Sequence, residues 1–331
     1  MAEPQGTPLA LTQPRHPYPG ETVQVSLLLV AMALATSDSS RLDSPKALRI
    51  SVAAAETLAV TISGADAGKP LVLIPGLFGS QFGFRKIVPP LNADGYRTII
   101  IEPLGIGASS RAPRADYSLT AQADRIARVL DALHVDSALV VAHALGAAMA
   151  LRLAYQRPDL VRGLVALDGD ASETAVTPAF RQTLRLIPWI RLFGGMKLIR
   201  KKTRENLVAS SGDTTWVTDD VVAEYTAGTA RDLDGTLKAY VAMANAKERD
   251  RLAPHLAEVL CPVRLVVGGA PHAGSMGDAD VTLLQRSLRA LAIDSIAGAG
   301  HYLHEERPDV VVEAVARLEA AMSGQRAVLN R

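Results

Sequence analysis

The sequence predicts an α/β fold in which helices cover both faces of a doubly wound, mostly parallel sheet. Several short apolar runs, among them Pro70–Ile74 and Val161–Leu167, are continuous instead of alternating with polar residues. Such runs are typical of strands that are buried on both faces. Segments with apolar residues at helical spacing, such as Leu119–His134, separate these runs. Because the connections are short, we expect repeated βα units.

The expected elements follow this alternation along the chain. Short β-type stretches are expected within Ala47–Ser63, and the buried strands at Pro70–Ile74, Tyr96–Glu102, Ser137–Ala142, Val161–Leu167, Pro262–Val267 and Ile293–Ile296. The expected helices are Phe82–Asp94, interrupted at Pro89-Pro90, then Leu119–His134, Leu145–Gln156 and Asp309–Met322. Pro158 and Gly95 follow two of these helices, as expected for residues that end a helix.

The alternation stops between about residues 171 and 250, where helical stretches occur without a convincing buried strand. We interpret residues 171–250 as a helical cap inserted into a core formed by residues 46–170 and 251–325. Such a cap would supply the walls of a pocket at the ligand-binding edge of the sheet. Residues 1–45 differ in composition and are expected to be an N-terminal extension, either disordered or signal-like.

The extension contains an apolar run at Val25–Ala35 that ends in small residues, like the central part of a signal peptide. A long leader and Glu21 precede the run, whereas a secretory signal begins with a short basic segment. The cytoplasm is therefore the expected location, with export through residues 25–35 as the alternative. The run is too short to span a bilayer as a helix, and no integral membrane span is predicted.

The composition indicates a globular protein with a small-molecule partner. The chain has 331 residues, 48% of them hydrophobic, with 35 Lys and Arg against 34 Asp and Glu. A net charge of +1 without a basic stripe argues against nucleic acid as a partner. Cys261 is the single cysteine, which excludes an intramolecular disulfide and a multi-cysteine metal site. The sequence does not predict the oligomeric state.

Four short motifs carry the chemistry, and each follows a predicted strand. They are Leu73-Ile74-Pro75-Gly76-Leu77-Phe78-Gly79, Glu102-Pro103-Leu104-Gly105-Ile106-Gly107-Ala108-Ser109, Ala142-His143-Ala144-Leu145-Gly146 and Gly298-Ala299-Gly300-His301. The third motif is a sharp strand-to-helix turn built from small residues. Its central position, where G-x-S-x-G carries a serine nucleophile, is Ala144. A methyl group cannot attack a carbonyl.

These four motifs, in this order, resemble the α/β-hydrolase superfamily between about Pro70 and Met322. The resemblance is closest to the cap-bearing branch that includes esterases, epoxide hydrolases and haloalkane dehalogenases. It implies that residue 144 is the nucleophile position of an elbow and that His301 is the general base. The backbone N–H groups of Leu77 and Leu145 would stabilise an oxyanion.

The motifs do not by themselves identify the carboxylate that would orient His301. Relatives often place it after the strand that ends here at Gly268-Gly269, but no carboxylate follows until Asp278. The superfamily also uses the end of the strand after the elbow helix. Asp168 at that point is our choice to orient His301, with Asp170 as the second choice.

The pocket candidates are Phe78, His143, His272, Trp189 and Trp216. For His143, packing against the sheet is the favoured interpretation. No cofactor and no metal are expected. A site made of His272, His301 and His304 is disfavoured because no acidic ligand is spaced with these histidines.

Two explanations for Ala144 stay open. In the favoured one, alanine has replaced a serine, so that the chain is a carboxylic ester (acyl) hydrolase that is inactive or traps its substrate. In the other, the chain naturally lacks a nucleophile and acts as a pseudoenzyme or ligand-binding protein, or uses His301 alone as a base. An aspartate nucleophile, as in dehalogenases and epoxide hydrolases, is a further variant of the family's chemistry. A small ester or similar acyl compound is the expected substrate.

Overall fold

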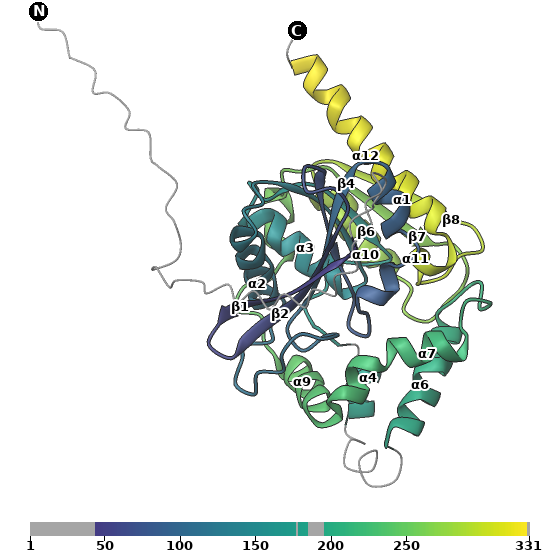
Figure 1. Cartoon of the computed structure of the whole chain (residues 1–331). Coiled ribbons are helices and arrows are strands. Elements are labelled where there is room, and N and C mark those ends of the chain that lie inside the picture. Colours follow the sequence, from purple (N-terminus) through teal and green to yellow (C-terminus); the bar gives the residue numbers. More distant parts are fainter. Residues whose placement is uncertain (1–43, 177, 185–194, 330–331) are drawn as a thin grey trace, which may run out of the picture.

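A single eight-stranded sheet organises the chain (Figure 1). The computed structural model describes residues 44–176, 178–184 and 195–329. The strands are β1 (Lys46–Ala53), β2 (Glu56–Ser63), β3 (Lys69–Ile74), β4 (Tyr96–Glu102), β5 (Ala138–His143), β6 (Val161–Leu167), β7 (Val263–Gly268) and β8 (Leu291–Ile296). They lie in the order β1-β2-β4-β3-β5-β6-β7-β8. Only the pairings of β2 are antiparallel, so the mostly parallel sheet that the sequence predicts is confirmed.

Helices and short 3-10 segments connect the strands. The core contains η1 (Gln81–Phe84), α1 (Val88–Ala93), α2 (Leu119–Ala132), α3 (Leu145–Gln156), η3 (Ala253–Glu258), α10 (Asp278–Ser287), α11 (Leu303–Glu306) and α12 (Pro308–Leu329). The helix predicted over Phe82–Asp94 is therefore two elements. The second begins around Pro89-Pro90 because prolines fit the first helical turn, where an N–H has no intrahelical partner.

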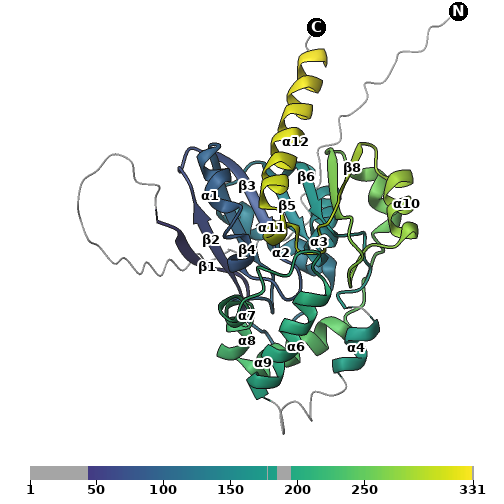
Figure 2. The same cartoon turned by 90° about the vertical axis from the view of Figure 1, so that its right-hand side faces the viewer.

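The sheet is buried on both faces, which explains the continuous apolar runs. Side chains alternate along a strand, so Val72 and Ile74 of β3 pack into one core cluster and Leu71 and Leu73 into the other. Helices α2 and α3 cover the first face, and α1 and α12 cover the second (Figures 1 and 2). Cys261 is buried beside this core, and burial raises the pKa of its thiol to about 12.

A further group of helices separates β6 from β7. These helices are α4 (Pro178–Leu184), α6 (Gly195–Ala209), α7 (Asp219–Tyr225), α8 (Ala227–Arg231) and α9 (Leu233–Asn245). In both views they form one layer at the end of the sheet (Figures 1 and 2). Within the described part of residues 171–250 no strand occurs. We refer to α4, α6, α7, α8 and α9 together as the cap.

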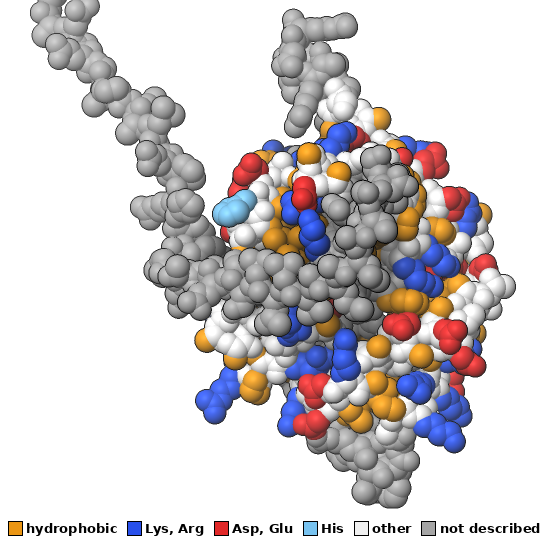
Figure 3. Space-filling view, viewed as in Figure 1, with side chains coloured by type: hydrophobic (Ala, Val, Ile, Leu, Met, Phe, Trp, Pro, Cys, Tyr) orange, Lys and Arg blue, Asp and Glu red, His pale blue; other side chains and the backbone are white. Residues whose placement is uncertain are grey.

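The predicted extension and its apolar run at 25–35 lie outside the described residues, except for residues 44 and 45. No helix in the described ranges has the length and apolar character needed to cross a bilayer. On the face shown in Figure 3, acidic and basic side chains are interspersed.

Candidate active site

The predicted site residues follow neighbouring strand ends at one edge of the sheet. Ala144 comes directly after β5 and Asp168 directly after β6, and the register pairs His143 with Leu167. His301 follows β8 at a distance of a few residues. Because β5 to β8 are parallel, their carboxyl ends meet at this edge. The edge thus gathers residues that are far apart in the sequence.

The turn at Ala144 has the strained geometry of a nucleophile elbow. Ala144 has φ 49° and ψ −119°, and α3 begins at the next residue. A non-glycine residue with positive φ costs on the order of 1–3 kcal/mol and persists only where the surroundings enforce it. Ala144 and Leu145 are half-buried between fully buried neighbours, so the tip of the turn is accessible.

Close backbone contacts explain the small residues around the turn. A side chain at Gly146 would lie 2.6 Å from the carbonyl oxygen of Ile74, and one at Gly169 would lie 2.5 Å from that of Ala144. A Cβ at Gly76 would meet the Cβ of Ala144 at 3.2 Å. The loop after β3 is therefore packed directly against residue 144.

Asp168 and His301 form a direct hydrogen bond. Oδ2 of Asp168 lies 2.6 Å from Nδ1 of His301, and the carboxylate is buried. Asp168 itself has φ 44°, a second positive value at a strand end. Its Oδ1 accepts a long bond of 3.4 Å from the N–H of Gly268. The contact between Oδ2 of Asp168 and Nδ1 of His301 makes Nδ1 the donor nitrogen of the neutral His301 ring. Nε2 is then the nitrogen that can take up a proton.

The other predicted acid positions have different surroundings. Asp170 lies on the same loop, where burial and the nearby Asp280 raise its pKa. Asp278 is exposed and begins α10. Among the described residues, Asp168 is the carboxylate with a hydrogen bond to His301.

His272 also binds Asp168, a contact that the sequence analysis missed. Its side chain is fully buried, with Nε2 2.9 Å from Oδ2 of Asp168 and Nδ1 2.7 Å from the carbonyl oxygen of Ala270. The available signal was a histidine at the strand end where relatives often have their acid. The sequence analysis treated it as a pocket candidate, whereas the structure directs it toward Asp168.

Asp168, His272 and His301 form a cluster in which the atoms that could bind a metal ion lie within 4.8 Å of one another. The metal site considered from the sequence lacked an acidic ligand, and the structure supplies Asp168 in place of His304. The spacings of 2.6 and 2.9 Å are those of hydrogen bonds. Two ligands about 2.0–2.1 Å from a tetrahedral ion lie about 3.3 Å apart, so these contacts fit shared protons better than an ion.

His143 and His304 lie behind the elbow as neutral rings. Nε2 of His143 lies 3.0 Å from the carbonyl oxygen of His301, and the rings of His143 and His304 are 4.5 Å apart. Burial lowers the pKa of His304 to about 3 and that of His143 well below its ordinary value, and neighbouring histidines add to both effects. Both rings are therefore packing residues at neutral pH.

The loop after β3 is held by the core and by the cap. Glu102 accepts from the N–H of Gln81 at 2.8 Å and from that of Ala108 at 2.5 Å, which joins the second motif to the start of η1 just after the loop. Tyr240 of α9 donates to the carbonyl oxygen of Leu77 at 3.4 Å. Because α3 begins at Leu145, the N–H of this residue has no intrahelical partner. The oxyanion role expected for the N–H groups of Leu77 and Leu145 stays a prediction.

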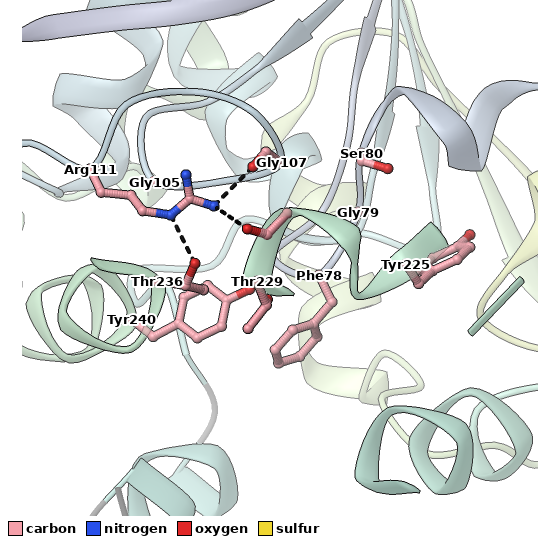
Figure 4. Close-up of a pocket in the computed structure, with 11 residues that line it drawn as sticks. Phe78, Gly79, Ser80, Gly105, Gly107, Arg111, Tyr225, Thr229, Thr236 and Tyr240 are labelled. Carbon is pink, nitrogen blue, oxygen red and sulfur yellow. Dashed lines mark hydrogen bonds between the residues drawn. The ribbon is translucent and has the colours of Figure 1, made fainter. Parts of the chain in front are cut away.

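A pocket opens between this loop and the cap (Figure 4). Phe78 lines it and packs edge-on against the rings of Phe180 and Tyr240. The guanidinium of Arg111 donates to Thr236 Oγ1 at 2.8 Å and to the carbonyl oxygen of Gly107 at 2.9 Å. Arg111 therefore ties the second motif to α9. His143, His272 and Trp216 do not line this pocket.

The cap also contacts the loop that carries His301. The carbonyl oxygen of Ser210 accepts from the N–H of His301 at 2.7 Å. Tyr225 donates to Glu305 at 3.0 Å, and Glu305 also binds Arg85 of the core. Trp216 packs beside Tyr225 and Tyr302 in a separate buried cluster. The pocket candidate Trp189 lies outside the described residues.

Comparisons with known proteins agree with this architecture. Residues 69–193 match the family model described as alpha/beta hydrolase fold. The uncharacterised hydrolase YugF of Bacillus subtilis is 25% identical over 248 residues, 74% of this chain and 88% of that protein. The sn-1-specific diacylglycerol lipase ABHD11 of Xenopus tropicalis is 25% identical over 250 residues, 74% of this chain and 76% of that protein. The solved epoxide hydrolase CorEH has a TM-score of 0.70 at 20% identity, covering 84% of this chain and 100% of that chain.

Proposed function

We propose that this chain, a member of the α/β-hydrolase superfamily with a cap, has the binding and proton-transfer groups of a carboxylic ester hydrolase but lacks its nucleophile. The observation that carries the proposal is the combination of two features at one sheet edge. His301 is hydrogen-bonded to Asp168 at 2.6 Å, and Ala144 keeps the strained elbow conformation. With alanine at residue 144, the chain would bind its substrate without hydrolysing it.

Each remaining group has a defined role in the proposed chemistry. The carbonyl carbon of an ester would lie above residue 144, and its oxygen would accept hydrogen bonds from the N–H groups of Leu77 and Leu145. With a hydroxyl at residue 144, Nε2 of His301 would take the hydroxyl proton as the oxygen attacks. It would then return the proton to the departing alkoxide, and a water molecule would release the acyl group by the same steps.

An ester is the favoured substrate class for two reasons. Elbows with a serine mostly perform acyl transfer, which is an analogy at the level of the fold. A relative of similar length is named as a diacylglycerol lipase. The aromatic wall formed by Phe78, Phe180 and Tyr240 beside the loop after β3 suits an apolar acyl or aryl group.

Ala144→Ser tests this proposal. The variant should hydrolyse short-chain aryl esters, with kcat above that of the unaltered chain by a factor on the order of 10⁵–10⁶, because the loss of a nucleophilic serine in other hydrolases costs about that much. The measurement is turnover over a series of acyl lengths. The control is Ala144→Ser combined with His301→Ala, which should return to the background rate. Equal, negligible turnover by the unaltered chain and by a folded Ala144→Ser variant would reject the proposal.

The alternative without a nucleophile makes a different prediction. The absence of a hydroxyl at Ala144 favours ligand binding, or a reaction in which His301 acts alone as a base. In that case the unaltered chain would convert a small molecule from a cell extract, and His301→Ala would abolish the conversion.

The proposed compartment is the cytoplasm, and cell fractionation would distinguish it from export.

A further inference from the structure

His272 lies between a backbone carbonyl oxygen and a carboxyl oxygen, each within hydrogen-bond distance of one ring nitrogen. The carbonyl oxygen of Ala270 is 2.7 Å from Nδ1, so Nδ1 carries a proton and donates it. On the other side of the ring, Nε2 is 2.9 Å from Oδ2 of Asp168. The same Oδ2 accepts from Nδ1 of His301 at 2.6 Å. One carboxylate oxygen therefore faces two imidazole rings.

The proton count follows from this geometry. A neutral imidazole has one N–H, and His272 already uses it toward Ala270. A bond between Nε2 and Oδ2 then needs one more proton, which resides on Nε2 or on Oδ2. In either case the pair Asp168 and His272 holds one proton more than a carboxylate beside a neutral ring, and its net charge is zero.

The charged surroundings of His272 support this extra proton. The groups that face it are Asp168 after β6, His301 after β8 and Glu306 of α11. Burial lowers the pKa of His272, whereas the Ala270 carbonyl, Asp168 and Glu306 raise it, and the net direction is upward. His143 and His304 on the elbow side shift in the opposite direction.

We propose that His272 is a positioning residue that holds Asp168 through the additional proton and cancels its charge toward His301. In an ordinary triad the acid presents a full negative charge, which stabilises the protonated base. Here His301 keeps the oriented hydrogen bond but receives little of that electrostatic help. Asp168 thus orients the base, and His272 determines how much negative charge Asp168 presents to it. The inference concerns the unaltered chain and does not depend on hydrolytic activity.

The proton count can be measured directly by ¹⁵N NMR of the histidine rings in the unaltered chain at pH 7.5, with EDTA present and absent. The spectrum of His272→Gln assigns the His272 resonances. We expect both ring nitrogens of His272 to carry protons, or Nε2 to share one with Asp168, and EDTA to change nothing. An Nε2 without any proton at this pH would overturn the proposal. So would a change of the His272 signals with EDTA, because it would mean that a metal ion holds the cluster.

The charge effect is measured by the titration of the His301 ring. His272→Gln keeps an N–H that can reach Asp168 but removes the positive charge. The pH midpoint at which His301 takes up a proton should rise by about one unit or more, because an unbalanced carboxylate stabilises the imidazolium. His255→Gln is the matched control, since His255 also contacts two carboxylates but is partly exposed and lies outside the cluster of Asp168, His272 and His301. An unchanged His301 titration in a folded His272→Gln protein would contradict the proposal.

Discussion

Strands β5 and β6 lie side by side, and the residue after each of them has a positive φ: 49° at Ala144 and 44° at Asp168. At Asp168 this backbone directs a carboxylate toward His301 and His272. At Ala144 the same kind of backbone carries only a methyl group, which lies beside Gly76. The elbow conformation therefore comes from the packing of the turn and does not require a reactive side chain.

The surroundings of the two strand ends differ as well. Behind the elbow, His143 and His304 are buried, no carboxylate of the described residues bonds to them, and their pKa values are lowered. Beside Asp168, the pKa of His272 is raised despite its burial, because the Ala270 carbonyl and Asp168 favour its protonated form. The end of β5 is thus surrounded by neutral imidazole rings, whereas at the end of β6 a carboxyl group and an imidazole share a hydrogen bond. The following predictions separate the two ends.

The largest expected effect concerns the choice of acid and is measured in the Ala144→Ser background. Asp168→Asn should lower kcat by a factor on the order of 10²–10⁴, since an amide can hold His301 in the wrong tautomer. Asp278→Asn, on the exposed start of α10, should change kcat less than about twofold. If Asp278→Asn were the damaging change, the assignment of Asp168 would be wrong.

The next effect compares the stability of the two turns by urea denaturation. Asp168→Gly should lower the free energy of unfolding by about 2 kcal/mol or more, because the buried ring of His272 and the partly exposed ring of His301 lose their acceptor. Ala144→Gly should stay within about 1 kcal/mol of the unaltered chain. Glycine relieves the positive φ but increases the entropy of the unfolded chain by a similar amount. A loss at Ala144→Gly as large as that at Asp168→Gly would mean that the methyl group has a structural role.

The smallest effect is a difference in pH dependence. The pKa of His304 is about 3 in the folded chain and about 6.5 when unfolded, so the unfolded state binds the proton first. Stability should therefore fall as the pH drops below 6.5, by about 1 kcal/mol per pH unit from this residue. His304→Leu should remove that part of the slope between pH 6 and 5. An identical slope in a folded His304→Leu protein would contradict the assignment of a neutral buried ring.

His272 should show the opposite sign. Its pKa is raised, so its contribution is fully present below about pH 6.5 and is lost as the pH rises through the folded value. The stability difference between the unaltered chain and His272→Gln should narrow as the pH rises through the raised pKa of His272 in the same denaturation series.

The sequence predicted the parts of the fold that depend on local patterns. Helix α3 and strand β6 have the predicted bounds, because continuous apolar runs and the small residues of the elbow are local signals. Helix α10 was not predicted, since Asp278–Ser287 is polar and only Leu284 is fully buried. The helix at the C-terminus was predicted too short and extends from Pro308 to Leu329.

The contact between His272 and Asp168 could not be read from the sequence. The two residues are 104 positions apart and meet only because β6 and β7 are paired in the sheet. A motif search at the end of β7 looks for a carboxylate. It passes over His272, which binds the carboxylate that follows the neighbouring strand β6. The pairing of Asp168 with His301 was therefore accessible from the sequence, whereas the contact of Asp168 with His272 required the three-dimensional arrangement.

The central claim is that the site needs only a hydroxyl at residue 144 to become reactive. The most direct measurement is covalent labelling of Ala144→Ser by an aryl fluorophosphonate, followed by mass spectrometry of the peptide that contains the elbow. This readout does not require knowledge of the natural ester. We predict one adduct on the introduced serine, and none on the unaltered chain or on Ala144→Ser combined with His301→Ala. A folded Ala144→Ser protein that stays unlabelled, or that is labelled equally without His301, would contradict the account.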